Sequence, residues 1–403
     1  MKRVVITGIG IISSIGNNKE EVLTSLQNSK SGIVYKQELK DKGFRSCVNG
    51  AINIDTSSII DRRELRFMGQ AAAYAQIAMM QAVADSGLDK DKVSNDRTGL
   101  LVGSGGASNS DIVESYDILK KSGSTKRLGP YRVPRTMSST TSACLATNFE
   151  IKGVTYSISS ACASSAHCVG AAMEQIQLGK QDIMFAGGGE ELHWSLSMLF
   201  DGMGALSSQY NDAPTTASRP FDTGRDGFVI TGGGAIVVLE GYEHAKARGA
   251  KIYGEIVGYG ATADGYNMVQ PSGEGAVRCM RQALQQVDKV DYVNAHGTST
   301  PIGDLKEVDA LHEVFGSNMP VVSSTKSLTG HSLGAAGAQE LIYSILMLEQ
   351  NFACGTLNLE KPIDNASDSK RFINENTSME INAVMSNSFG FGGVNASLVV
   401  KKV

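Results

Sequence analysis

One of the six cysteines stands where a reactive thiol would be placed. Cys162 follows an alternating, β-branched run that predicts a strand over 154–159, and it precedes an alanine-rich run that predicts a helix over 163–178. At the start of a helix, unpaired backbone N–H groups and the helix dipole favour a thiolate over a thiol. We therefore expect Cys162 to have a lowered pKa and to act as a nucleophile at neutral pH.

The pattern around Cys162 occurs a second time further along the chain. Residues 159–175 share seven identities in seventeen positions with residues 323–339, at a constant offset of 164 positions. This offset pairs Cys162 with Lys326 and His167 with His331. The repeat indicates a duplicated strand-turn-helix unit in which one copy carries the nucleophile and the other handles charge. His167 lies beyond the nucleophile on the same predicted helix, so we expect it to pack or to cap.

Two histidines complete a reactive set with Cys162. His296 directly follows a predicted strand over 292–295, at the sheet edge where open α/β folds place their ligand sites, and His331 opens a predicted helix in the same half. A neutral imidazole could donate a hydrogen bond to a thioester oxygen and so stabilise an enolate or an oxyanion. Each histidine alone could equally be a hydrogen-bonded structural residue. The pairing with a cysteine at a helix start favours catalysis.

Lys326 and a glycine-rich loop are the remaining chemical features. Asp304 and Glu307 lie one helical turn apart after His296, so Lys326 is either buried with carboxylate partners or exposed in a helix salt bridge. The repeat favours the buried position. In the segment 387–393 (NSFGFGG), glycines would let backbone N–H groups converge as they do in an oxyanion hole.

The elements that must position these residues fall into two sets. Strands are predicted over 3–7, 98–102, 154–159, 182–186 and 235–239, and then over 252–260, 292–295, 321–324, 381–385 and 396–401. Helical patterns lie between them, at 67–84 and 163–178 in the first set and at 276–287, 304–315 and 333–349 in the second. This alternation predicts mostly parallel sheets covered on both faces, in two halves, 1–248 and 249–403. The reactive residues would meet where the halves join.

Composition limits the class of protein. With 41% hydrophobic and 19% charged residues, the chain is typical of a globular protein. A net charge of −4 argues against bulk attraction to nucleic acid or to an anionic membrane, and no apolar stretch reaches the roughly 20 residues of a membrane span. There is no Cys-x-x-Cys spacing and no secretory context, so we expect neither zinc nor disulfides, and a cytoplasmic location.

A partial dinucleotide-binding motif offers an alternative. Gly8 and Gly10 follow the first predicted strand, which would suggest an oxidoreductase. The next glycine is Gly16, with five intervening residues instead of two, and no acidic residue ends the expected second strand. This motif is therefore a weak basis for a nucleotide site.

Four segments in a fixed order carry a resemblance to a known family. They are 160–164 (SACAS), 294–300 (NAHGTST), 324–331 (STKSLTGH) and 387–393 (NSFGFGG). Over essentially the whole chain the sequence resembles the β-ketoacyl-acyl carrier protein synthases of the condensing-enzyme class, and the segments 175–182 and 271–279 are similar to the type I bacterial form. The resemblance implies a thiolase-like α/β fold of two pseudo-symmetric halves in five αβαβα layers, working as a homodimer.

The resemblance also implies a role for each reactive residue. Cys162 would take the acyl chain as a thioester, and His296 and His331 would bind the malonyl thioester carbonyl and promote decarboxylation. Lys326 would support that site electrostatically. The N–H groups of Cys162 and Phe391 would form an oxyanion hole, Phe389 and Phe391 would act as gates, and Thr298 and Thr300 would bind pantetheine. Supporting carboxylates would be Asp304, Glu307 and Glu340. No cofactor is required, and a structural monovalent cation would lie near Asn294, Glu340, Ser386 and Asn387.

The implied reaction is a decarboxylating Claisen condensation. The cysteine accepts an acyl group from a carrier-protein thioester, malonyl-carrier protein loses CO2, and the carbanion attacks the enzyme thioester to give a 3-oxoacyl thioester two carbons longer. The carrier protein of this family is acidic, so basic residues are candidates for docking it, although roughly half would be ordinary surface charge. These candidates are Arg62, Arg63, Arg66, Lys121, Lys126 and Arg127.

Single positions bear on the subtype and on competing functions. Gly106 resembles the type I form, which implies a roomier channel and unsaturated acyl chains, whereas Val394 stands where related enzymes more often have threonine and Ala295 where the type I form can have serine. A type II synthase or a polyketide ketosynthase subunit is therefore the alternative. A degradative thiolase would need a second cysteine near the C-terminus, and Cys354 comes too early. An inactive polyketide partner subunit would lack the nucleophile, which Cys162 contradicts.

Overall fold

A ten-stranded sheet runs through the computed structural model, which describes residues 1–367 and 370–403. Its strand order is β10-β9-β13-β14-β8-β1-β7-β6-β4-β5. The first half supplies β1 (Val4–Ile12), β4 (Thr98–Gly103), β5 (Thr155–Tyr156), β6 (Ile183–Glu190) and β7 (Gly233–Gly241). The second half supplies β8 (Gly254–Ala263), β9 (Tyr292–Asn294), β10 (Val321–Ser323), β13 (Ala383–Gly390) and β14 (Val394–Lys401). Each predicted strand has a counterpart among these ten.

The two halves of the sheet have the same arrangement. In the first half, the strand order outward from the centre is β1, β7, β6, β4 and β5, with two antiparallel pairings followed by two parallel ones. The second half repeats this pattern in β8, β14, β13, β9 and β10. An antiparallel pairing of β1 with β8 joins the halves. The prediction of mostly parallel sheets is therefore wrong. One cause is the three-residue turn 391–393 between β13 and β14, which is too short for a parallel crossover.

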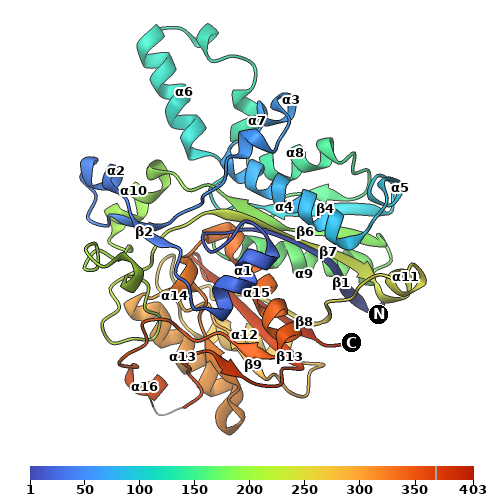
Figure 1. Cartoon of the computed structure of the whole chain (residues 1–403), viewed down its shortest axis with the longest axis vertical. Coiled ribbons are helices and arrows are strands. Elements are labelled where there is room, and N and C mark those ends of the chain that lie inside the picture. Colours follow the sequence, from blue (N-terminus) through green and yellow to red (C-terminus); the bar gives the residue numbers. More distant parts are fainter. Residues whose placement is uncertain (368–369) are drawn as a thin grey trace.

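Helices cover this sheet in layers, as Figure 1 shows. α4 (Gln70–Ser86) and α8 (Thr140–Asn148) pack on the outer face of the first half, and α12 (Glu274–Ala283) packs on the outer face of the second with α13 (Pro301–Phe315) beside it. α9 (Ser164–Gln177) and α15 (Ala336–Gln350) contact each other and strands of both halves. These are the predicted αβαβα layers, and the two duplicated segments supply the central helices.

The glycines of the partial dinucleotide motif serve packing. A Cβ atom on Gly10 would lie 1.9 Å from the carbonyl oxygen of Ala78, and one on Gly8 would lie 2.7 Å from that of Ala82. Ala78 and Ala82 lie on α4, which rests directly on β1. Glycine is therefore required here to let a helix approach a strand.

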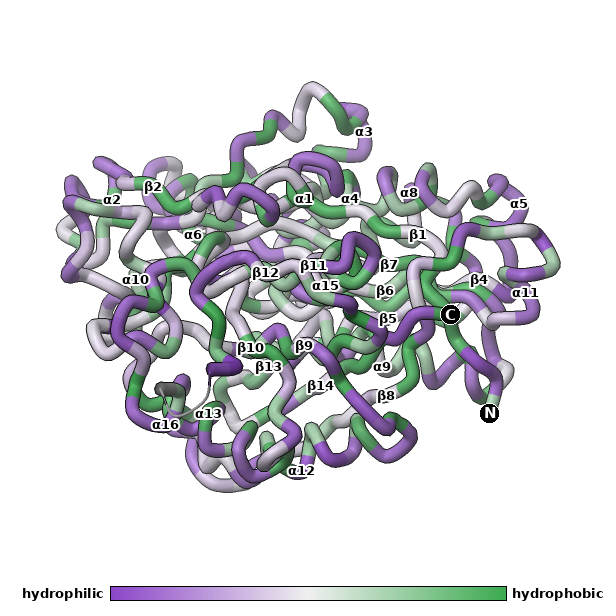
Figure 2. Tube along the Cα trace, turned by 60° about the horizontal axis from the view of Figure 1, so that its bottom comes forward, coloured by the Kyte–Doolittle hydropathy of each residue, from purple (hydrophilic) through white to green (hydrophobic). Residues whose placement is uncertain are grey.

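The other elements lie mostly around this layered core. Figure 2 shows hydrophobic segments along the interior strands and hydrophilic ones at the outer turns, and α6 (Asn109–Ser122) stands out from the body of the molecule in Figure 1. The remaining elements are α1 (Lys19–Gln27), α2 (Gln37–Asp41), α3 (Arg62–Leu65), α5 (Lys90–Val93), α7 (Arg132–Thr136), α10 (Trp194–Met203), α11 (Tyr242–Ala247), α14 (Lys326–Thr329), α16 (Asp364–Ser367), β2 (Ile33–Tyr35), β3 (Val48–Gly50), β11 (Phe352–Ala353) and β12 (Thr377–Ser378). Among the described helices, none combines the length and the apolar character needed to cross a bilayer.

Candidate active site

The nucleophile turn lies between the short strand β5 and helix α9. Ala161 has a φ of +50°, in the left-handed region, and α9 begins at Ser164, two residues after Cys162. The Ser164 hydroxyl holds the turn, because it accepts a hydrogen bond from the Ser160 N–H at 2.8 Å and donates one to the Ala161 carbonyl at 2.7 Å. His167 makes a hydrogen bond of 2.6 Å through Nδ1 to the Ser160 hydroxyl, so it supports the turn, as expected of a packing residue.

The second copy of this unit departs from the first where its helix is interrupted. α14 ends at Thr329, Gly330 takes a φ of +75°, and α15 starts only at Ala336. His331 lies in the extended segment between them, where its N–H donates to the Val229 carbonyl at 2.7 Å. The prediction that His331 opens a helix is wrong, because the glycine breaks the helix and releases the imidazole towards the cavity.

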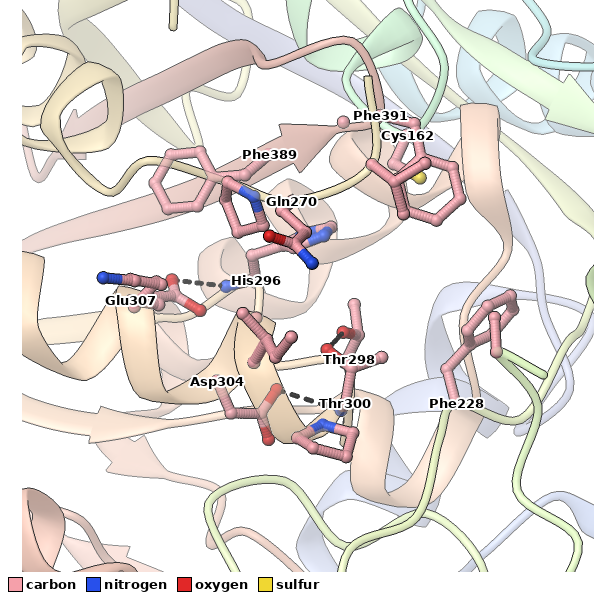
Figure 3. A pocket seen from close by; sticks show the side chains of 18 of the residues that line it. Cys162, Phe228, Gln270, His296, Thr298, Thr300, Asp304, Glu307, Phe389 and Phe391 are labelled. Atoms are coloured by element: carbon pink, nitrogen blue, oxygen red, sulfur yellow. Dashed lines mark hydrogen bonds between the residues drawn. The ribbon is translucent and has the colours of Figure 1, made fainter. Parts of the chain in front are cut away.

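A cavity of about 350 Å³ brings the reactive residues of both halves together. Cys162 from the first half and His296 and His331 from the second all line it. The two imidazole rings lie 5.3 Å apart, centre to centre, nearly at right angles. Figure 3 shows Phe391 beside Cys162 and Phe389 near His296, with Thr298 and Thr300 on the other side of the space.

The environment of Cys162 differs from the one predicted. Burial and the negative charge of Glu190 raise the pKa of the thiol to about 12, while the positive charge of Lys326 and the backbone N–H groups of Phe391 and Cys162 lower it. The predicted lowered pKa is therefore wrong, because desolvation outweighs the helix start. The N–H groups of Phe391 and Cys162 nevertheless favour negative charge at this position, as expected of residues in an oxyanion hole. A Cβ on Gly390 would lie 3.2 Å from the Cys162 nitrogen, so glycine allows this approach.

Both active-site imidazoles are neutral and available. Burial, and then the charge of Lys326, lower the pKa of His296 and of His331 well below 6.5. Among the described residues, neither ring nitrogen of His331 and not Nδ1 of His296 has a hydrogen-bond partner. Buried polar atoms seldom lack a partner. These ring nitrogens could therefore bond to a molecule bound in the cavity.

Lys326 is buried, as predicted, but its partner is not one of the two carboxylates that follow His296. Its Nζ lies 2.5 Å from Oε1 of Glu340, and both side chains are 2% exposed. Glu307 instead accepts hydrogen bonds from the N–H groups of His296 and Gly297, at 2.8 and 2.7 Å. Burial raises the pKa of Glu340 and that of Glu307 to about 7.

Asp304 supports the loop that carries the two threonines. It accepts from the N–H groups of Phe221 at 2.8 Å and Thr300 at 3.3 Å, and burial raises its pKa to about 6. The Thr298 and Thr300 hydroxyl oxygens lie 3.1 Å apart at the cavity wall. Arg225 donates to the carbonyl of Thr300 at 3.1 Å, a contact that sequence reasoning missed because its partner is a backbone group 75 positions away.

The residues expected near a monovalent cation have oxygen atoms that could bind it. Oε2 of Glu340 and Oγ of Ser386 are buried without a hydrogen-bond partner among the described residues. Asn294 on β9 and Asn387 on β13 add amide oxygens, although these accept bonds from Thr325 and Ser397. Carboxylate, hydroxyl and amide oxygens suit a hard cation. The donor set therefore fits the implied ion.

The six basic residues expected to dock a carrier protein are all exposed but form two groups in one chain. Arg62 and Arg63 lie on α3 and Arg66 directly follows it. Lys121 lies at the outer end of α6, and Lys126 and Arg127 lie in the short 3-10 turn after it. α6 separates the second group from the body of the molecule in Figure 1.

Two family models divide this chain between them. The β-ketoacyl synthase N-terminal domain matches residues 1–245 and the C-terminal domain matches residues 253–360. The chain belongs to the β-ketoacyl synthase family. The family and enzyme class predicted from the sequence are thereby confirmed.

Individual relatives agree with the family models. The chain is 58% identical to 3-oxoacyl-acyl-carrier-protein synthase 1 of Escherichia coli strain K12, over the full length of both. A β-ketoacyl synthase from Burkholderia phymatum STM815 superimposes with a TM-score of 0.94 at 37% identity, again over the full length of both chains. A ketosynthase bound to a hexaketide, solved with its type II PKS acyl-carrier protein, has a TM-score of 0.90 at 30% identity and covers 100% of this chain and 99% of its own. The type I subtype is favoured.

Proposed function

We propose that this ketosynthase catalyses the decarboxylating condensation of an enzyme-bound acyl group with malonyl-acyl carrier protein in fatty acid elongation. The observation that carries the proposal is the meeting of Cys162 with two neutral imidazoles in one cavity. Within the described part of the chain, both ring nitrogens of His331 and Nδ1 of His296 have no hydrogen-bond partner. The E. coli relative, at 58% identity, bears the corresponding name.

The first half-reaction transfers the acyl group to the cysteine. The Cys162 thiol is protonated at rest, so its proton leaves as the sulfur attacks the thioester carbonyl, and the neutral imidazoles in the cavity are available bases. The carbonyl oxygen becomes an oxyanion within reach of the N–H groups of Cys162 and Phe391. The bond to the carrier's sulfur then breaks, and the departing thiolate takes up the proton.

The second half-reaction forms the carbon–carbon bond. His296 and His331 donate to the malonyl thioester oxygen, the carboxylate leaves as CO2, and the remaining electron pair forms an enolate. Its carbon attacks the carbonyl of the Cys162 thioester, and the carbon–sulfur bond breaks. The released cysteine thiolate takes a proton from solution. The 3-oxoacyl product, two carbons longer, stays on the carrier protein.

We place the substrates' pantetheine arm against Thr298 and Thr300, which line the cavity. Phe389 and Phe391 would act as gates, since Phe391 is 39% exposed and its ring lies 6.3 Å from that of Phe200 at the entrance. The two groups of exposed basic residues, at α3 and beyond α6, would dock the acidic carrier protein.

The acyl chain would extend past Gly106. A Cβ there would lie 3.5 Å from Leu196, a member of the apolar cluster that contacts Cys162. A bulky side chain at this position would narrow that region. The lack of a side chain at Gly106 therefore supports a wider acyl channel and the use of unsaturated acyl chains.

We further propose that the enzyme is a homodimer. β5 is an edge strand of the sheet, and Tyr156 on it is 42% exposed. Through α8 and α7 this edge connects to α6, where Ile112 and Tyr116 are 55% and 61% exposed. An open strand edge beside exposed apolar side chains favours pairing with a second copy.

A structural monovalent cation would neutralise part of the buried charge below the site. Glu340 Oε2, Ser386 Oγ, Asn294 and Asn387 would hold it, and no other cofactor enters the proposal. We also propose that the enzyme works in the cytoplasm, because all six cysteines are free thiols.

Reconstitution tests this function. The wild type is incubated with acyl-carrier protein and malonyl-carrier protein, and the products are followed as CO2 and 3-oxoacyl-carrier protein by mass spectrometry. We expect one CO2 for each acyl chain extended, saturated and unsaturated acyl carriers being compared. Acyl transfer without carbon–carbon bond formation would contradict the proposal.

A further inference from the structure

A buried carboxylate behind Cys162 takes no part in the reaction described above. Glu190 ends β6 and has no exposed surface. Oε1 accepts hydrogen bonds from the Ser104 hydroxyl at 2.9 Å and the Gly106 N–H at 3.0 Å. Oε2 accepts from the N–H groups of Gly105 at 2.7 Å and Gly334 at 2.9 Å. Each carboxylate oxygen of Glu190 therefore accepts two hydrogen bonds.

The donors come from both halves of the molecule. Ser104, Gly105 and Gly106 follow β4 in the first half, and Gly334 precedes α15 in the second. The two backbones touch, since a Cβ on Gly334 would lie 2.2 Å from the Gly105 nitrogen. Glu190 thus joins the halves at a point where neither Gly105 nor Gly334 has room for a side chain.

Each segment that Glu190 holds also borders the site. Gly106 lies against Leu196, and Leu333, which precedes Gly334, lines the cavity together with Cys162. Leu196 and Leu333 belong to one apolar cluster, against which Cys162 packs. Leu333 takes a φ of +47°, so the Gly334 hydrogen bond fixes a strained backbone. His331 lies three residues before Gly334.

We propose that Glu190 is a positioning residue that sets acyl-chain selectivity, by holding the segments of Gly106 and Leu333 that wall the region behind Cys162. This inference rests on the proposed condensing function. A carboxylate suits the task because two acceptor oxygens can serve four donors, whereas the amide of glutamine would present an NH2 group to one pair of them. Burial raises the pKa of Glu190 to about 7, and its four hydrogen bonds lower it.

The neighbouring Glu191 provides a matched control. It is equally buried and accepts bonds from the Ser110 N–H at 3.1 Å, the Ser110 hydroxyl at 2.7 Å and the Asn109 N–H. These donors lie at the start of α6 and not behind Cys162. Glu191→Gln therefore disturbs a buried carboxylate of the same kind, whose link to the wall is indirect and runs through Asn109, the side-chain amide of which donates to the Gly106 carbonyl at 3.1 Å.

The experiment measures acylation of Cys162 by hexanoyl, decanoyl and tetradecanoyl carrier proteins, using intact-protein mass spectrometry. In Glu190→Gln the rate ratio of tetradecanoyl to hexanoyl should change by about tenfold, the scale on which pocket contacts discriminate chain lengths. Glu191→Gln should leave this ratio within about twofold of the wild type, since its pocket contacts are intact. If Glu190→Gln does not fold, Ser104→Ala removes one of the four donors and should change the ratio by about threefold.

The outcomes separate this inference from the function on which it rests. An unchanged ratio in a folded Glu190→Gln enzyme, or equal changes in the two glutamine variants, would overturn the role of Glu190. If Glu190→Gln is unfolded, an unchanged ratio in Ser104→Ala would do the same. If the wild type acylates Cys162 with no chain of any length, the condensing function itself fails.

Discussion

At the scale of single residues, opposing effects act on the pKa of the Cys162 thiol. Burial raises the pKa of its thiol to about 12, and Lys326 and two backbone N–H groups act in the other direction. Both active-site imidazoles stay neutral, so either ring can accept the thiol proton when the acyl group binds. In the proposed reaction the thiol proton is therefore transferred during the attack, and the resting enzyme does not hold a thiolate.

This view predicts how Cys162 alkylation depends on pH. Below the pKa the thiolate fraction rises tenfold with each pH unit, so a thiol with a pKa of about 12 should react faster at every step from pH 6 to pH 10 without a plateau. Iodoacetamide labelling at Cys162, read by peptide mass spectrometry, measures this. A rate that levels off near neutral pH would mean that the helix start outweighs burial.

Lys326 should act on both halves of the site through its charge. Lys326→Met keeps an unbranched side chain one atom shorter but removes the cation, so the Cys162 pKa should rise further and alkylation at pH 8 should slow by roughly tenfold. Malonyl decarboxylation should fall as well, because Glu340 loses its partner. Lys251→Met removes a lysine from a half-exposed ion pair with Glu349 and should change neither rate.

At the scale of elements, one glycine separates the two copies of the duplicated unit. In the first copy a continuous helix, α9, carries His167, and in the second Gly330 breaks the helix so that His331 faces the cavity. The repeat was visible in the sequence, and so were the strands and helices around it. The break was not predicted, because a single glycine in a sequence does not by itself determine the path of the chain.

Gly330→Ala should damage catalysis more than stability. Its Cβ would lie 2.8 Å from the Val229 carbonyl oxygen, the acceptor for the His331 N–H, so His331 should move and the condensation rate should fall by at least about tenfold. Gly87→Ala is the control, since Gly87 also has a positive φ but no atom within 4 Å of the new Cβ. It should lose about 1 kcal/mol in urea unfolding and retain full activity. Equal activity in both variants would show that His331 is not placed by this turn.

Other contacts of the site were beyond sequence reasoning for a shared reason. Glu190 and Arg225 bind mainly backbone groups, and a backbone donor or acceptor leaves no trace in residue type. The predicted pKa of Cys162 failed similarly, because desolvation depends on packing from both halves. The residues identified by type and spacing, Cys162, His296 and His331, do meet in one cavity.

At the scale of the whole molecule, the fold joins two copies of one arrangement across β1 and β8. The predicted five layers are confirmed, while the strand directions were missed because parallel and antiparallel neighbours share the same alternating pattern. The division of the chain at 248 and 249 stays a prediction. The layering explains why the site lies between halves, since each half supplies one central helix and one part of the chemistry.

The proposed homodimer leads to a prediction about mass. The wild type should sediment at about twice the chain mass of 42.6 kDa. Ile112→Glu combined with Tyr116→Glu, which places charge on the exposed face of α6, should shift the enzyme towards the monomer. Met80→Glu, at an exposed position of α4, should leave the mass unchanged. A monomeric wild type would contradict the proposed assembly.

The most direct test of the whole account is a single turnover of the pre-acylated enzyme. The acyl group is first loaded on Cys162, malonyl-carrier protein is added, and the protein mass, CO2 and 3-oxoacyl-carrier protein are followed together. We expect the acyl mass to leave Cys162 in step with CO2 release and to appear, two carbons longer, on the carrier protein. Condensation that continues in Cys162→Ala, or CO2 release while the acyl group remains on the cysteine, would contradict it.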